Sequence, residues 1–183
     1  MRMITEDIKT ELSVGEFLEG FVDIPRFAAC CAECRGYGKT WACPPYEFDP
    51  ATVWQGYERI LLAGKKVYVP EGEHRAENAS KAAAELLAPV KSTLTAELYE
   101  MEKAEPGSLA LFAGGCDICS ECTRGKGEPC RFPERMRFSV ESLGGNAQKV
   151  IEELFKVPLL WGENGVLPEY FVLLGALLKY PRS

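Results

Sequence analysis

The sequence predicts an α/β or α+β fold, in which a small mixed sheet of about three to five strands is covered by one long helix. Apolar runs of strand length alternate along the chain with segments of helical periodicity. The hydrophobic share of 46% and the charged share of 26% are typical of a globular protein. A length of 183 residues suits one compact core, so we expect residues 1–183 to form a single cysteine-rich domain.

The N-terminal half of the chain contains both kinds of element. Residues 5–21 mix apolar and acidic side chains and fit either a short helix or a strand followed by a turn. Residues 23–49 are rich in Gly, Pro and Cys and predict an ordered loop without regular structure. Residues 49–57 open with Asp-Pro, a favourable helix start, and predict a short helix. Residues 59–69 predict either a strand with a bulge at Gly64 or two short strands.

The C-terminal half begins with the most regular segment of the sequence. Apolar side chains recur at steps of three and four residues from Ala76 onwards, which predicts a long amphipathic helix over residues 74–103. Pro89 lies in its interior and should bend or divide it. Three further elements are predicted: a strand at 108–112, a helix at 146–155 and a strand at 169–178.

Charge and hydropathy exclude several classes of protein. A net charge of −6 and a pI near 5.0 argue against nucleic-acid binding, which depends on clustered Lys and Arg. The longest apolar stretch, residues 170–178, is too short to cross a bilayer. The N-terminal segment carries acidic residues where a signal peptide has its apolar centre. We therefore expect a cytoplasmic protein without a membrane span.

Eight cysteines are the unusual feature of the composition. A reducing cytosol disfavours disulfides, so another use of the thiols is expected. The cysteines fall into two groups, within loops predicted at about residues 26–47 and 114–137. Each loop is therefore a candidate metal-binding segment.

The second group consists of Cys116, Cys119, Cys122 and Cys130. Three cysteines at successive two-residue spacers can surround one side of a compact inorganic cluster, and a fourth from further along can close it. Ferredoxin loops have the same arrangement with a shorter last spacer. This group predicts a [4Fe-4S] cluster.

The first group consists of Cys30, Cys31, Cys34 and Cys43. The adjacent pair points in different directions, so one of the two is expected to be a ligand, and Cys31 is favoured because it forms a Cys-x2-Cys pair with Cys34. Cys30 or a residue other than cysteine would complete a second cluster; otherwise one iron stays open. Zinc is the alternative at both groups, although structural zinc sites usually combine two separated Cys-x2-Cys pairs.

These motifs resemble a known family. The residues that carry the resemblance are the run from Cys31 to Pro45, the run from Gly114 to Cys122, the segment from Glu128 to Glu134 and the segment from Ser139 to Gly144. They are similar to the predicted metal-binding proteins of the uncharacterised bacterial and archaeal family called domain of unknown function 2284. The resemblance implies cysteine-rich metal binding, without an established reaction. The family's first group has three cysteines, so Cys30 departs from its pattern.

The sequence therefore predicts an iron–sulfur protein with at least one [4Fe-4S] cluster, and with two if the first group also binds one. Its predicted role is electron transfer to or from a redox partner protein, because such a cluster needs no acid–base residues for this. Two alternatives stay open: an iron–sulfur enzyme whose open iron binds a small substrate, and a zinc-stabilised binding module. A homo-oligomer is also left open.

Overall fold

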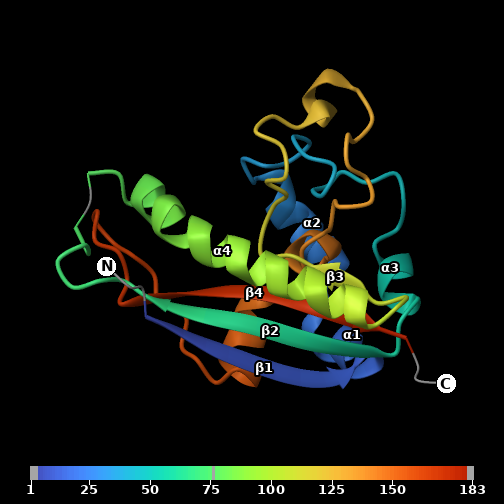
Figure 1. Cartoon of the computed structure of the whole chain (residues 1–183), viewed down its shortest axis with the longest axis horizontal. Coiled ribbons are helices and arrows are strands. Elements are labelled where there is room, and N and C mark those ends of the chain that lie inside the picture. Colours follow the sequence, from blue (N-terminus) through green and yellow to red (C-terminus); the bar gives the residue numbers. More distant parts are fainter. Residues whose placement is uncertain (1–3, 76, 181–183) are drawn as a thin grey trace.

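The computed structural model describes residues 4–75 and 77–180, which contain a four-stranded sheet with a long helix on one face (Figure 1). The strands are β1 (Thr5–Ser13), β2 (Arg59–Tyr68), β3 (Leu109–Leu111) and β4 (Tyr170–Lys179). Their order is β1-β2-β4-β3, and every neighbouring pair is antiparallel. The predicted class is confirmed in its α+β form, with an antiparallel sheet in place of the expected mixed one.

β2 and β4 form the centre of the sheet, and their pairing continues without a break from Arg59 opposite Lys179 to Tyr68 opposite Tyr170. The predicted bulge or division at Gly64 is therefore wrong. A Cβ atom at Gly64 would lie 2.4 Å from Cε2 of Phe155. The glycine allows the close approach of an aromatic ring and leaves the strand regular.

Residues 5–21 form a strand and then a helix. β1 ends at Ser13, which caps α1 (Val14–Phe21): its hydroxyl accepts from the Glu16 amide at 3.1 Å, and the Glu16 carboxylate accepts from the Ser13 amide at 2.9 Å. This reciprocal pair is a capping box. Residues 5–21 thus contain both a strand and a helix, so apolar periodicity over the whole segment matched neither element alone.

The predicted irregular loop over residues 23–49 is wrong in its first part, where α2 (Ile24–Ala32) forms. The Asp23 side chain caps this helix by accepting from the Arg26 amide at 3.1 Å, and Pro25 occupies the first turn. Gly36, Gly38, Pro44 and Pro45 all follow the helix. Cys30 and Cys31 are therefore helical residues.

α3 (Ala51–Gln55) lies within the predicted segment 49–57, and Asp49 accepts from its first amide at 2.9 Å. The long helix α4 (Ala79–Ala104) begins later than predicted, after Asn78, whose side chain caps it. Pro89 lies in its interior without dividing it. Ala76 lies outside the described residues.

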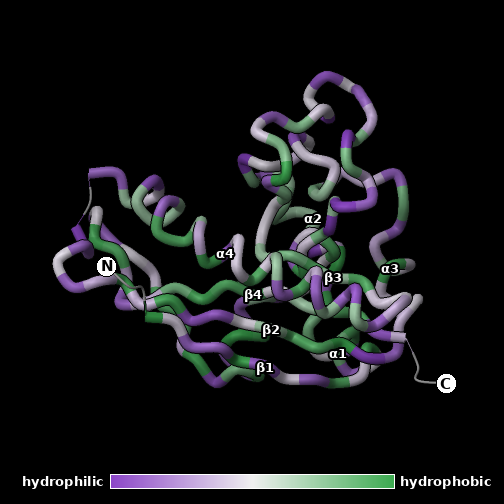
Figure 2. Tube along the Cα trace, in the orientation of Figure 1, coloured by the Kyte–Doolittle hydropathy of each residue, from purple (hydrophilic) through white to green (hydrophobic). Residues whose placement is uncertain are grey.

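The last predicted helix consists of α5 (Ala147–Lys149) and a π-helical turn, η3 (Val150–Leu154). It belongs to the large core on one face of the sheet, which includes Phe17, Trp54 and Leu143. α4 covers the other face through Leu94 and Leu98. Figure 2 shows hydrophobic residues along most of β4, whereas the segments above the sheet are more hydrophilic. None of the helices in the described ranges has the length and apolar character that a bilayer span requires.

Candidate metal centres

The two cysteine segments lie together beside the β3 edge of the sheet, although they are far apart in the sequence (Figure 1). The indole Nε1–H of Trp41 donates to the carbonyl of Glu128 at 3.1 Å. The Arg124 guanidinium donates to the Thr40 carbonyl at 2.7 Å and to the carbonyls of Cys43 and Pro45. The second segment therefore holds the backbone of the first in place.

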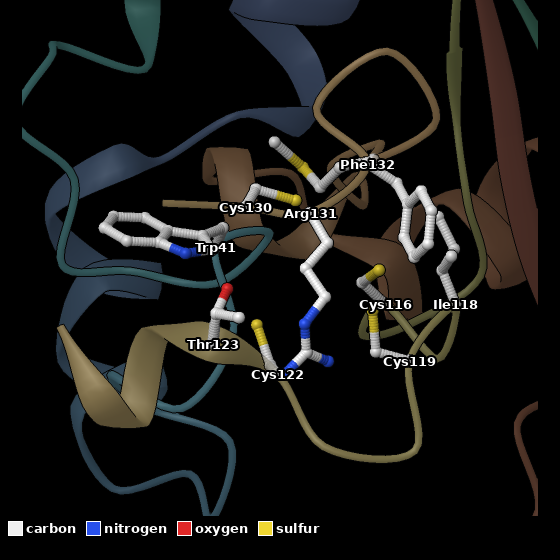
Figure 3. Close-up of a pocket in the computed structure, with 10 residues that line it drawn as sticks. Trp41, Cys116, Ile118, Cys119, Cys122, Thr123, Cys130, Arg131 and Phe132 are labelled. Atoms are coloured by element: carbon white, nitrogen blue, oxygen red, sulfur yellow. The ribbon is translucent and has the colours of Figure 1, made fainter. Parts of the chain in front are cut away.

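The second group of cysteines lines one cavity (Figure 3). Its sulfur-bearing residues are Cys116, Cys119, Cys122 and Cys130. Apolar side chains complete the wall, among them Trp41, Ile118, Phe132 and Met136, and Arg131 reaches across the cavity. All four cysteines are half-buried. The spacing predicted that these four residues share a site, and the structure brings them to the same cavity.

A compact turn returns the chain from Cys122 to Cys130. The buried Thr123 hydroxyl donates to the Pro129 carbonyl at 2.8 Å, and the Glu128 amide donates to the Thr123 carbonyl at 3.2 Å. Between them the 3-10 helix η1 (Thr123–Lys126) ends at Gly127, whose φ of 70° suits glycine. The long spacer before the last cysteine is therefore an ordered structure that closes the cavity.

The start of the second segment is fixed to α4. The Lys91 ammonium of α4 donates to the Gly115 carbonyl at 2.7 Å and lies 2.9 Å from the Asp117 carboxylate. Burial raises the pKa of the Cys116 thiol, although a hydrogen bond from the Ile118 amide acts in the opposite direction. A bound cation would stabilise the thiolate at this position.

The first group of cysteines lines a cavity of its own, the first cavity, of about 210 Å³, and the cavity of the second group is called the second cavity. Cys31, Cys34 and Cys43 belong to its wall, whereas Cys30 is exposed on α2 and is not part of it. The Cys34 amide donates to the Cys31 carbonyl at 3.0 Å, so the turn that follows α2 brings the second cysteine next to the first. Burial raises the pKa of the Cys31 thiol, and the negative charges of neighbouring thiolates raise it further.

Glycine backbone borders these sulfurs. A Cβ atom on Gly36 would lie 3.8 Å from Sγ of Cys34 and 3.9 Å from Sγ of Cys43. The Gly36 amide donates to Sγ of Cys34 at 3.4 Å, the type of N–H···S contact that tunes sulfur ligands. A Cβ atom on Gly115 would also lie 3.9 Å from Sγ of Cys43, so the second segment borders the first cavity.

Glu141 is the site residue that the sequence did not identify as one. It begins the 3-10 helix η2 (Glu141–Leu143) and lines the same cavity as the three cysteines. Burial raises the pKa of its carboxyl group, against the effects of its own amide, Ser139 and Lys91. In the sequence, Glu141 stands out only as part of the Ser139-to-Gly144 segment. There its carboxylate is interpreted as forming a capping pair with Ser139. In the structure the Ser139 hydroxyl accepts from the Ser142 amide at 3.1 Å, and no side chain caps η2 itself.

The cysteine thiolates of the two cavities are chemically suited to hold a metal, because thiolates are ligands of iron–sulfur clusters and of zinc. Within residues 4–75 and 77–180, however, no three His, Cys, Asp or Glu side chains are grouped tightly enough to hold a single metal ion. The cysteines surround two cavities without meeting at one point.

Together, the α+β fold and the two thiol-lined cavities define a small cysteine-rich protein of the metal-binding type. The chain belongs to the family described as predicted metal-binding protein (DUF2284), whose model matches residues 22–178. The family that the sequence motifs resemble is thereby confirmed. No curated protein and no solved structure matches the chain.

Proposed function

We propose that this protein binds iron–sulfur clusters at the two cysteine cavities and transfers electrons to or from a redox partner protein. The observation that carries the proposal is the cavity surrounded by Cys116, Cys119, Cys122 and Cys130. In this proposal the four thiolates hold a [4Fe-4S] cluster, and Cys31, Cys34 and Cys43 hold a second one.

The spacing of the thiols supports a cluster over a single ion. Tetrahedral zinc holds each sulfur at about 2.3 Å, so its ligands must converge closely. The thiols of the second group line one cavity, and within the described residues no three ligands are grouped tightly enough for a single ion, whereas a cluster offers each thiolate its own iron. The apolar wall that includes Trp41 and Phe132 would limit the access of water and so tune the cluster.

The accessibility of the cysteines supports electron transfer. Every cysteine that lines either cavity is exposed or half-buried. A partner could therefore approach a cluster edge without rearrangement of the fold. In this role the cysteines would bind the cluster, the apolar wall around Trp41 and Phe132 would exclude water from it, and the Gly36 amide would direct its dipole at a sulfur ligand.

The test is metal and sulfide analysis of anaerobically purified protein, with electron paramagnetic resonance of the reduced protein. We expect iron and acid-labile sulfide, and two reduced-cluster signals. Cys119→Ser should abolish one signal, whereas Ser120→Ala, a substitution at the exposed neighbouring residue, should retain both. Full intensity of both signals in Cys119→Ser would contradict the ligand assignment.

The metal content decides between the proposal and the zinc-stabilised module. Protein that contains zinc and lacks sulfide would overturn the electron-transfer proposal in favour of a zinc-stabilised module. Clusters that cannot be reversibly reduced by a chemical or protein donor would also overturn it.

A further inference from the structure

Glu141 has a buried oxygen without a partner. Among the described residues, only two buried side-chain oxygens make no hydrogen bond, and they are Oγ1 of Thr40 and Oε2 of Glu141. Leaving such a group unpaired is unfavourable, and more so for a charged group. A carboxylate oxygen in this position needs either a proton donor or a cation.

Lys91, which lines a neighbouring cavity together with Glu141, does not fill that need. Lys91 donates to the Gly115 carbonyl and pairs with Asp117 at 2.9 Å. Ser142 is also engaged, since its hydroxyl donates to the Ser139 carbonyl at 3.0 Å and accepts from the Ser139 amide at 3.0 Å. The Ser139 side chain is the neighbour that acts on the Glu141 carboxylate, and among the described residues Oε2 still has no hydrogen-bond partner.

The packing of η2 fixes the position of Glu141 beside the cavity of the first cysteine group. Gly144, with a φ of 90°, ends η2, and a Cβ atom there would lie 2.7 Å from Ile24 in the first turn of α2. The Trp54 indole donates to the Leu143 carbonyl at 3.0 Å. η2 is thus packed against the helix that carries Cys31, and the Glu141 side chain lines the cavity of the three thiols.

That cavity has three thiols, and Cys30 is not part of its wall. Iron–sulfur clusters commonly have four protein ligands, and one can differ from cysteine. An ionised carboxylate is an oxygen ligand for iron.

We propose that the Glu141 carboxylate is a metal ligand and completes the site of Cys31, Cys34 and Cys43 as a set of three thiolates and one carboxylate. This inference rests on the proposed function and adds its missing ligand. It replaces two hypotheses for the first site: that Cys30 is the fourth thiolate ligand, and that one iron has no protein ligand.

The test compares Glu141→Gln with Cys30→Ser in the full-length chain, purified without air. Glutamine keeps the size of the side chain and removes the anionic ligand. We expect Glu141→Gln to lose or alter the reduced signal of the first site and to release the iron that the carboxylate holds. The signal of the second site should keep its full intensity, and Cys30→Ser should match the wild type in both signals.

A measurement on the wild type makes the test independent of whether the variant folds. In ⁵⁷Fe-enriched protein, Mössbauer spectra should resolve one iron of the first cluster from those with sulfur ligation only. Cys119→Ser simplifies the spectrum by removing the second cluster.

The outcomes separate this inference from the proposed function. Unchanged signals and iron content in Glu141→Gln, or loss of the first signal in Cys30→Ser, would overturn the Glu141 ligand and leave the iron–sulfur protein intact. The Glu141 ligand would also be overturned if the Mössbauer spectra of the wild type showed every iron with sulfur ligation only. A wild-type protein without iron would overturn both.

Discussion

Arg124 should be a main stabilising residue of the cysteine region. Its guanidinium donates to three carbonyls of the first segment, those of Thr40, Cys43 and Pro45, and lies 5.2 Å from the centroid of the Trp41 ring. Hydrogen bonds to charged groups contribute about 1.5–3 kcal/mol each, although not additively. Because Arg124 is only half-buried, we expect Arg124→Ala to lower the free energy of unfolding by about 2–4 kcal/mol in total.

For a chain of this length, that loss corresponds to a fall in the melting temperature of about 4–16 °C. The assay is thermal unfolding of anaerobically purified protein, with metal content measured on the same samples. Arg124→Lys keeps the charge without the planar fork and should lie between wild type and Arg124→Ala. The control is Lys126→Ala, because Lys126 makes only an exposed ion pair with Glu121. Equal melting temperatures for Arg124→Ala and Lys126→Ala would refute the reasoning.

Two further predictions concern the scaffold. Gly64→Ala should lower the free energy of unfolding by about 1–3 kcal/mol in urea titrations, because its new methyl group would lie 2.4 Å from the Phe155 ring. Glu102→Gln should cost about 3–5 kcal/mol, because the Glu102 and Arg137 side chains are only 16% and 13% exposed. Burial would raise the pKa of Glu102, but hydrogen bonds from Arg137 and the Ala110 amide outweigh it and lower the pKa below 4.5. This stabilisation is therefore complete above about pH 4.5 and is lost as the pH falls through the lowered pKa, so Glu102→Gln should flatten the acid side of a stability curve.

Both scaffold predictions have matched controls. Gly20→Ala adds a methyl group to α1 where, apart from the helix's own backbone and the chain neighbours, no atom of the described residues lies within 4 Å, so it should leave stability unchanged or raise it slightly. Glu100→Gln removes only an exposed pair with Lys103 and should leave the pH curve intact. A Gly64→Ala protein as stable as Gly20→Ala, or an acid limb in Glu102→Gln like that of the wild type, would contradict the respective argument.

The elements that the sequence predicted best are those whose pattern is long and local. The helical periodicity of α4 and the apolar run of β4 identified both elements, with errors at the boundaries. α2 was missed because its composition was judged together with the Gly- and Pro-rich residues that follow it. Gly64 was misjudged because the reason for the glycine, the Phe155 ring, is ninety-one residues away in the sequence.

The residues of the candidate site also fall into those that a local pattern predicted and one that it did not. Cysteine spacing is a local signal, and it grouped the residues that line each cavity. Glu141 lies about a hundred residues from the cysteines that share its cavity, and a single glutamate has no spacing to reveal it. Its signal is a buried oxygen without a partner, which exists only in the folded chain.

The two cavities are built as one structural unit. Trp41 belongs to the first segment and lines the second cavity, while Gly115 belongs to the second segment and borders Sγ of Cys43. Arg124 joins the two by holding the Cys43 carbonyl. Ordering irregular backbone costs about 1–2 kcal/mol per residue in entropy, and neither segment has enough regular structure to offset that cost alone. Each segment is therefore ordered by contacts with the other, so effects of substitutions at the two sites should not be additive.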